Sequence, residues 1–186
     1  MILKRFLCLF LILMLSGCSA RNQSIDRAMN MRQQLQNTGC TFDCAVSADY
    51  GNVVHTFTMR CTADTQGAVT FEVTSPESIS GITGTISQNK GKLTFDGNAL
   101  AFDLLADGQL SPVSAPWVLI HTLRGGYLAS CAEIEGGMLL SIDDSYETDP
   151  LRLDIRMDEE GKPCTAEILW QGRRILSMEV DNFTFV

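Results

Sequence analysis

The chain is poor in the residues on which most enzymes and nucleic-acid-binding proteins depend. Only two of its 186 residues are histidine, and 14 Lys+Arg stand against 22 Asp+Glu, which gives a formal charge of −8 at pH 7. No cluster of Lys or Arg is present to bind phosphates, so a nucleic-acid partner is excluded. With 45% apolar and 19% charged residues, the composition is typical of a folded protein rather than a disordered one. We therefore expect a single folded domain.

Motifs of the common catalytic and cofactor sites are also missing. The sequence contains no G-x-S-x-G, no H-E-x-x-H, no Walker A and no G-x-G-x-x-G pattern, so it offers no nucleophile elbow, zincin helix or nucleotide-binding loop. Nothing selects a pair of carboxylates for glycoside hydrolysis. We predict that the protein is not an enzyme and that it binds no cofactor or metal.

The N-terminus resembles the signal sequence of a bacterial lipoprotein. Lys4 and Arg5 precede a ten-residue apolar run over residues 6–15, and a bilayer span needs about 20 apolar residues. Leu15-Ser16-Gly17-Cys18 follows and resembles a lipobox. The resemblance implies that residues 1–17 are a signal peptide and that acyl chains such as palmitate anchor Cys18 in the membrane. The alternative is an ordinary signal peptide with a cysteine placed there by chance.

Cleavage before Cys18 would set both the location and the charge of the mature protein. Removal of Lys4 and Arg5 takes the formal charge from −8 to −10. The folded part would lie outside the cytoplasm, on the cell membrane, or on the outer membrane if the host is Gram-negative. Disulfides persist in such a compartment. We predict a tether over residues 18–23 and one domain over residues 24–186.

Two helices are expected. Residues 24–37 form a weakly amphipathic pattern, with Ser24 as a candidate cap and Gly39 suited to a left-handed residue after the end. Residues 114–124 form the second helix, with Ser114 as its candidate cap. That helix is apolar almost all round, so we expect it to be buried on most sides.

Between and after these helices the hydrophobic period is 2, which predicts about nine to eleven antiparallel strands. A two-residue turn at Tyr50-Gly51 would set Cys40 opposite Cys61. A turn at Asn89-Lys90 would set Ile86 opposite Leu93, and Asp96-Gly97 predicts a further hairpin. A three-residue loop at 171–173 would set Ile168 opposite Leu176, because a two-residue loop would break the alternation of faces.

Cysteine and histidine residues gather on the first hairpin. Cys40, Cys44, His55 and Cys61 share one face, but they spread over roughly 13 Å at the rise of a strand, too far for one zinc ion. A Cys40–Cys61 disulfide or a buried thiol pair is favoured instead. Five cysteines follow Cys18, so at least one stays unpaired within the chain. His55 and His121 are expected to be ordinary core or edge histidines. The acidic segment 143–149 is expected to be a solvated turn rather than a calcium site.

These elements predict an α+β fold that is mainly antiparallel β, with an open half-barrel of strands wrapping the buried helix and a further helix at the N-terminus. A cleft between helix and sheet is a common place for a ligand. The residues that would line it are Phe42, Phe57, Met59, Phe71, Trp117, Ile120 and Leu123.

The layout resembles the LolA/LolB-like superfamily of lipoprotein carriers and lipid-binding lipoproteins. The likeness rests on LSGC, on a helix leading into the hairpin GCTFDCAVSADYGNVVHTFTMRC, and on the helix SAPWVLIHTL between two blocks of strands. The stretch FEVTSPESISGITGTIS is similar to the germination lipoprotein GerS of spore-forming anaerobes. The superfamily resemblance implies an apolar ligand or lipidated partner in a concave cleft. The GerS branch implies a non-catalytic scaffold for a protein partner in cell-envelope or spore-cortex processing. We favour the apolar ligand, because many large apolar residues converge on one helix.

Overall fold

The computed structural model describes residues 19–49, 54–88, 90–95, 98–103, 105–106 and 109–186, and Cys18 lies outside them. Its main feature is one open antiparallel sheet of 11 strands, in the order β6-β5-β4-β3-β2-β1-β13-β12-β11-β10-β9. The elements of the chain are α2 (Ser19–Asn37), β1 (Cys40–Asp49), β2 (Val54–Ala63), β3 (Val69–Ser75), η2 (Glu77–Ile79), β4 (Thr83–Ser87), β5 (Lys90–Phe95), β6 (Asn98–Asp103), β7 (Leu105–Ala106), β8 (Gln109–Leu110), η3 (Pro112–Ser114), α3 (Ala115–Gly125), β9 (Tyr127–Ile134), β10 (Gly137–Asp143), β11 (Leu151–Met157), β12 (Pro163–Trp170) and β13 (Arg173–Phe185).

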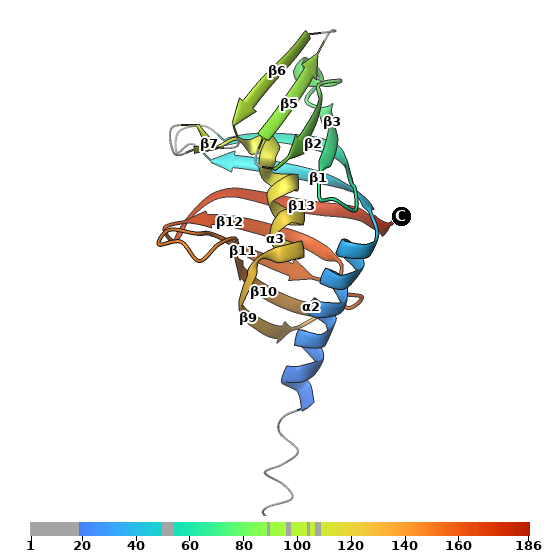
Figure 1. Ribbon diagram of the computed structural model, residues 1–186, viewed down its shortest axis with the longest axis vertical. Coiled ribbons are helices and arrows are strands. Elements are labelled where there is room, and N and C mark those ends of the chain that lie inside the picture. Colours follow the sequence, from blue (N-terminus) through green and yellow to red (C-terminus); the bar gives the residue numbers. More distant parts are fainter. Residues whose placement is uncertain (1–18, 50–53, 89, 96–97, 104, 107–108) are drawn as a thin grey trace, which may run out of the picture.

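The long strand β13 joins the two halves of the sheet. Strands β1–β6 follow one another as a meander on one side, β9–β13 do the same on the other, and β13 pairs with β1. Figure 1 shows α3 lying across the strands and α2 running beside it. We call the sheet face that carries α3 the inner face and the opposite face the outer face. The short pair β7–β8 stands apart from the main sheet.

The alternation of the sequence determines which side chains are buried. Along β1 buried and half-buried residues alternate strictly, and β3 and β11 show the same period. The inner-face residues of these strands belong to one hydrophobic core that also holds most of α3. The prediction of a mainly antiparallel sheet with two helices is therefore confirmed.

The register of the first hairpin differs from the prediction by two residues. Cys40 lies opposite Ala63, Phe42 opposite Cys61 and Cys44 opposite Met59. Asp49 pairs with Val54, so four residues join the strands rather than the two expected. The faces were predicted correctly because a shift of two residues preserves the alternation of a strand.

The hairpin β4–β5 shows the same kind of error. Ile86 lies opposite Gly91 rather than Leu93, and Gly84 lies opposite Leu93. Ser87 pairs with Lys90, so the turn is placed one residue earlier than predicted, and Gln88 there has a positive φ of 49°. The Asp96-Gly97 hairpin is confirmed, because Phe95 pairs directly with Asn98.

The last hairpin, β12–β13, has the predicted register at Ile168, although its turn is shorter than predicted. Ile168 lies opposite Leu176, as predicted, but Trp170 pairs with Arg173 across a two-residue turn. A register shift between Ile168 and Leu169 supplies the missing residue. A bulge can therefore preserve the burial pattern where the turn alone would break it.

The helix ends also differ from the predicted caps. The helix α2 begins at Ser19, and Ser24 within it is buried and donates a hydrogen bond to Glu133 Oε1. Ser114 precedes α3 but makes no capping hydrogen bond, because it is itself helical at the end of η3. Gly39 is needed for close packing rather than for a left-handed conformation, since a Cβ there would lie 2.7 Å from the carbonyl oxygen of Ala63.

Candidate functional site

The helix α3 bridges distant strands of the inner face. It contacts β2 and β3 in one half of the sheet and β10 in the other. Six inter-strand spacings separate β3 from β10, roughly 29 Å on a flat sheet. An 11-residue helix is only about 16 Å long. The sheet therefore has to curve towards the helix for one short helix to contact both halves.

The seven residues predicted to line a cleft are all buried in the hydrophobic core. Phe42 comes from β1, Phe57 and Met59 from β2, Phe71 from β3, and the remaining three from α3. All belong to the same buried cluster. Their exposed fractions are 2% for Phe42, 8% for Phe57, 1% for Met59, 3% for Phe71, 5% for Trp117, 0% for Ile120 and 4% for Leu123.

This burial shows that the junction is packed rather than hollow. Side chains lining an empty cavity of several hundred Å3, the size that a lipid-sized ligand needs, would keep water-accessible surface. The values of 0–8% leave almost none. The seven residues therefore form a core in this conformation, and a ligand could enter among them only if α3 moved away from the sheet.

The apolar inner face continues beyond α3 onto residues that were not among the seven predicted. One cross-strand row runs from Phe71 through Gly84 and Leu93 to Leu100 on the edge strand β6. Leu93 is half-buried, whereas Leu100 is 65% exposed and Phe95, on the same face of β5, is 51% exposed. We call Leu93, Phe95 and Leu100 the tip patch. The alternation about the Asp96-Gly97 turn was the signal that could have identified it.

Gly84 positions the tip patch against the core. An added Cβ would lie 2.7 Å from Phe71 Cε1 and 3.0 Å from Leu93 Cδ2, both shorter than an ordinary carbon contact of about 3.5–4.0 Å. The Phe71 ring therefore fills the space that a side chain at position 84 would occupy. Because position 84 has no side chain, the buried Phe71 of β3 and Leu93 of β5 can both pack over Gly84.

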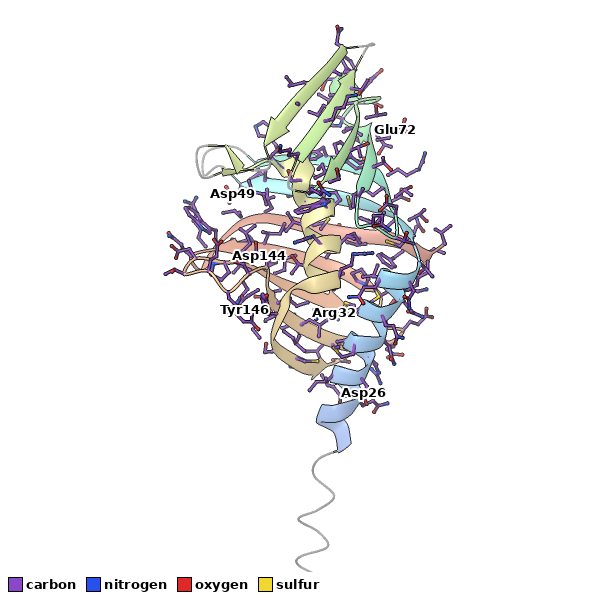
Figure 2. The ribbon with its side chains drawn as sticks, viewed as in Figure 1. Asp26, Arg32, Asp49, Glu72, Asp144 and Tyr146 are labelled. Carbon is purple, nitrogen blue, oxygen red and sulfur yellow. The ribbon has the colours of Figure 1, made fainter. Side chains whose placement is uncertain are left out.

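Two arginines hold α2 and α3 together. Arg32 of α2 donates from Nε to Leu123 O (3.0 Å) and from NH2 to Gly126 O (2.7 Å), at the end of α3. In return, Arg124 of α3 donates to Leu35 O of α2 and, from NH2, to Thr65 O (2.8 Å). Each guanidinium therefore binds one carbonyl in the last turn of the other helix, Leu123 O or Leu35 O, where helical carbonyls lack an intrahelical partner. Figure 2 shows Arg32 between α2 and the end of α3. Burial lowers the pKa of the Arg32 guanidinium.

The two histidines occupy different surroundings. His55 lies on β2, opposite Ala48 of β1, and its side chain is exposed rather than in the core. His121 stacks on Trp117 with the ring centroids 4.5 Å apart. Burial lowers the pKa of His121, and the carboxylate of Asp144 partly opposes this effect. Within the described residues, no group of three or more His, Cys, Asp or Glu side chains could hold a metal ion.

The cysteines predicted to form a disulfide are not directly opposite each other. The residue directly opposite Cys61 in the strand pairing is Phe42. Cys40 and Cys44 therefore both lie diagonally from Cys61. The thiols of Cys44 and Cys61 are in contact, with 3.8 Å between the two Sγ atoms. All cysteines of the described residues are free thiols in the structure, so the Cys40–Cys61 bond stays a prediction.

Polar side chains line two surface grooves within the described residues. A groove of about 440 Å3 on the outer face of β2–β5 is lined by threonines together with Arg60, Glu72 and Lys92. A second, of about 340 Å3, lies beside the acidic segment and includes Asp143, Asp149 and Arg152. Arg152 binds both carboxylate oxygens of Asp143 and thereby lowers the pKa of that group. Neither groove reproduces the predicted apolar cleft. In the described part of the chain, no helix is long and apolar enough to cross a membrane.

The fold resembles several solved structures, although the sequence itself matches little. No protein-family model and no curated protein matches the sequence. Similar solved structures include an uncharacterized conserved protein from Thermus thermophilus (14% identity, TM-score 0.49, 88% of each chain covered). They also include a LolA superfamily protein from Nitrosomonas europaea (10% identity, TM-score 0.45, 86% of this chain and 93% of that one). A third is lipoprotein LppX of Mycobacterium tuberculosis (11% identity, TM-score 0.39, 87% and 92%). All three TM-scores lie below 0.5, so these likenesses carry no argument about function.

Proposed function

We propose that the protein is a non-catalytic binding module, held outside the cytoplasm by acyl chains on Cys18, that binds an apolar ligand or the acyl group of a lipidated partner on the inner face of its sheet. In this proposal the sheet is a half-barrel around α3, and the ligand lies on the tip patch rather than in the predicted cleft. The lipobox-like segment at residues 15–18 supports the anchor.

The observation that carries the proposal is the continuous apolar row from Phe71 to Leu100. At its inner end Phe71 is buried, whereas Leu100 at its outer end is 65% exposed and the neighbouring Phe95 is 51% exposed. Burying a large apolar side chain that is otherwise exposed gains about 1.5–3 kcal/mol. An acyl chain lying along this row would gain that energy without any opening of the core.

Binding of a fluorescent fatty-acid analogue tests this proposal. A Phe95→Ser/Leu100→Ser double variant should weaken binding by roughly 10–1000-fold, because two apolar contacts are lost. Ala99→Ser on the outer face of β6 is the matched control and should bind like wild type. Trp117→Ala separates the two surfaces: it leaves binding unchanged if the ligand lies on the tip patch, and weakens it if the ligand enters beneath α3. If wild type takes up no probe, the apolar-ligand proposal fails.

A scaffold for a protein partner in cell-envelope or spore-cortex processing is the second candidate. It is favoured by the packed core together with the open edge of the sheet at β6. An edge strand offers unpaired backbone groups to an incoming strand, and no register shift interrupts the pairing of β6 with β5. A folded protein that binds no fatty-acid probe, yet loses its envelope partner when Leu100 is replaced by proline, would favour this function over the first.

The anchor is tested separately from the ligand. Replacing Cys18 with serine removes the thiol that would carry the acyl chains, so the protein should move from the membrane fraction to the soluble extracytoplasmic fraction. Cys131→Ser, at a half-buried cysteine of the folded domain, serves as the control and should stay with the membranes. Continued membrane association of a folded Cys18→Ser variant would contradict the anchor.

A further inference from the structure

Three cysteines line the inner face of the hairpin β1–β2, and the strand register leaves two choices for pairing them. Cys61 lies opposite Phe42, and Cys40 and Cys44 are its two diagonal neighbours. On a flat sheet both diagonals are equal, but the right-handed twist of paired strands makes one of them shorter. Here the diagonal that brings two sulfur atoms into contact joins Cys44 and Cys61, which are 3.8 Å apart.

We propose that Cys44 and Cys61 are joined by a disulfide in the mature protein, and that Cys40 remains a thiol. Forming the bond requires the sulfur atoms to move from 3.8 Å to about 2.05 Å. Both thiols already point into the same space between paired strands, so side-chain rotation with a small backbone adjustment can achieve this. The bond would replace the predicted Cys40–Cys61 pairing.

The bond requires a disulfide donor, for example a protein thiol oxidant or glutathione disulfide. One thiolate of the pair attacks the donor and forms a mixed disulfide, which releases the first donor thiol. The second thiolate then attacks the cysteine sulfur of that mixed disulfide and releases the second donor thiol. The two cysteines lose two electrons and two protons in total, and the donor disulfide is reduced to two thiols.

The reaction has to take place before the hairpin is buried. Cys44 and Cys61 are 3% and 1% exposed, so a donor cannot reach them in the folded protein. The contact with Cys44, together with burial, raises the pKa of the Cys61 thiol, and burial raises the pKa of Cys40 to about 12. Thiols with raised pKa are inert in exchange. Oxidation during folding should therefore be fast, and oxidation of the folded, reduced protein slow.

Peptide mapping without reduction tests the proposal directly. The protein is extracted from membranes, denatured with an alkylating agent, and digested with enzymes that cut after Lys/Arg and before Asp. Arg60 separates Cys44 from Cys61, and Asp43 separates Cys40 from Cys44. The expected product is segment 43–48 linked to segment 61–63, with Cys40 alkylated in segment 33–42. A link between 33–42 and 61–63, or alkylation of both Cys44 and Cys61, would overturn the proposal.

A refolding experiment adds a readout that does not depend on the cellular compartment. Whole chain refolded from denaturant with glutathione disulfide should melt about 6–12 °C higher than chain refolded with reductant, because the bond closes a loop over residues 44–61. The difference should vanish in Cys44→Ala and persist in Cys40→Ala, which is the matched control at the other diagonal. A difference that persists in Cys44→Ala and vanishes in Cys40→Ala would assign the bond to Cys40 and refute the proposal.

Discussion

The arginine connection between α2 and α3 provides the sharpest test of how this fold is held together. Arg32 reaches from the middle of α2 to the end of α3 and donates two hydrogen bonds to backbone carbonyls there, at 3.0 and 2.7 Å. Replacing Arg32 with alanine removes both bonds and leaves the carbonyls of Leu123 and Gly126 to be solvated by water.

The expected loss follows from the charge of the donor. Each hydrogen bond from a charged group contributes about 1.5–3 kcal/mol, and partial hydration of the freed carbonyls returns some of it. We therefore expect Arg32→Ala to lower the free energy of unfolding by about 3 kcal/mol. In a domain of this size that corresponds to a fall in Tm of roughly 6–12 °C. Arg32→Lys should recover less than half of the loss, because an ammonium group cannot span two carbonyls as a planar guanidinium does.

Urea denaturation followed by circular dichroism measures these values. Gln33→Ala, at the next and exposed position of α2, is the matched control and should change stability by less than about 0.5 kcal/mol. Because the acceptors are neutral carbonyls, the effect of Arg32→Ala should change little with ionic strength, whereas a simple charge effect would be screened. A stability of Arg32→Ala within about 0.5 kcal/mol of wild type, or full recovery in Arg32→Lys, would refute the reasoning.

Two further predictions follow from single contacts. Gly84→Val should destabilise the protein by about 1–3 kcal/mol, because the new side chain would overlap with the Phe71 ring. The shift of the urea midpoint measures this loss. Gly81→Ala is not a suitable control, because Gly81 has a positive φ of 84°. Ser87→Ala on the same strand serves instead, and an equal shift in both variants would contradict the contact. His121 should make stability depend on pH: its pKa is lowered by burial, so the folded state prefers the neutral ring and the contribution is complete above about pH 6.5. This contribution to stability is lost as the pH falls below that value, because the unfolded chain then binds the proton more readily. The slope of stability against pH between about pH 7 and 5 should therefore be smaller in His121→Gln. An unchanged slope would exclude His121 as its source.

The hairpin registers show where sequence reasoning is weakest. The faces of β1 and β2 follow from alternation alone, yet the predicted pairing of Cys40 with Cys61 is off by two residues. Alternation cannot detect such a shift, because every side chain stays on its own face. Asp49 pairs with Val54, whereas the turn signal at Tyr50-Gly51, which lies outside the described residues, indicated a shorter connection.

The apolar pattern of the sequence was enough to predict a mainly antiparallel sheet and two helices, because the periodicity of apolar residues reports which side of an element is buried. Phe42, Met59, Trp117 and Ile120 lie in the buried core, as their place in the apolar pattern indicates. Whether the space between α3 and the sheet is hollow or filled could not be predicted from this pattern. The curvature of the sheet towards α3 sets the volume between them, and that curvature depends on contacts of α3 with strands more than 50 residues apart in sequence. The tip patch lies on β5 and β6 at one end of the sheet, and the exposure of Phe95 and Leu100 there is likewise a property of the folded chain.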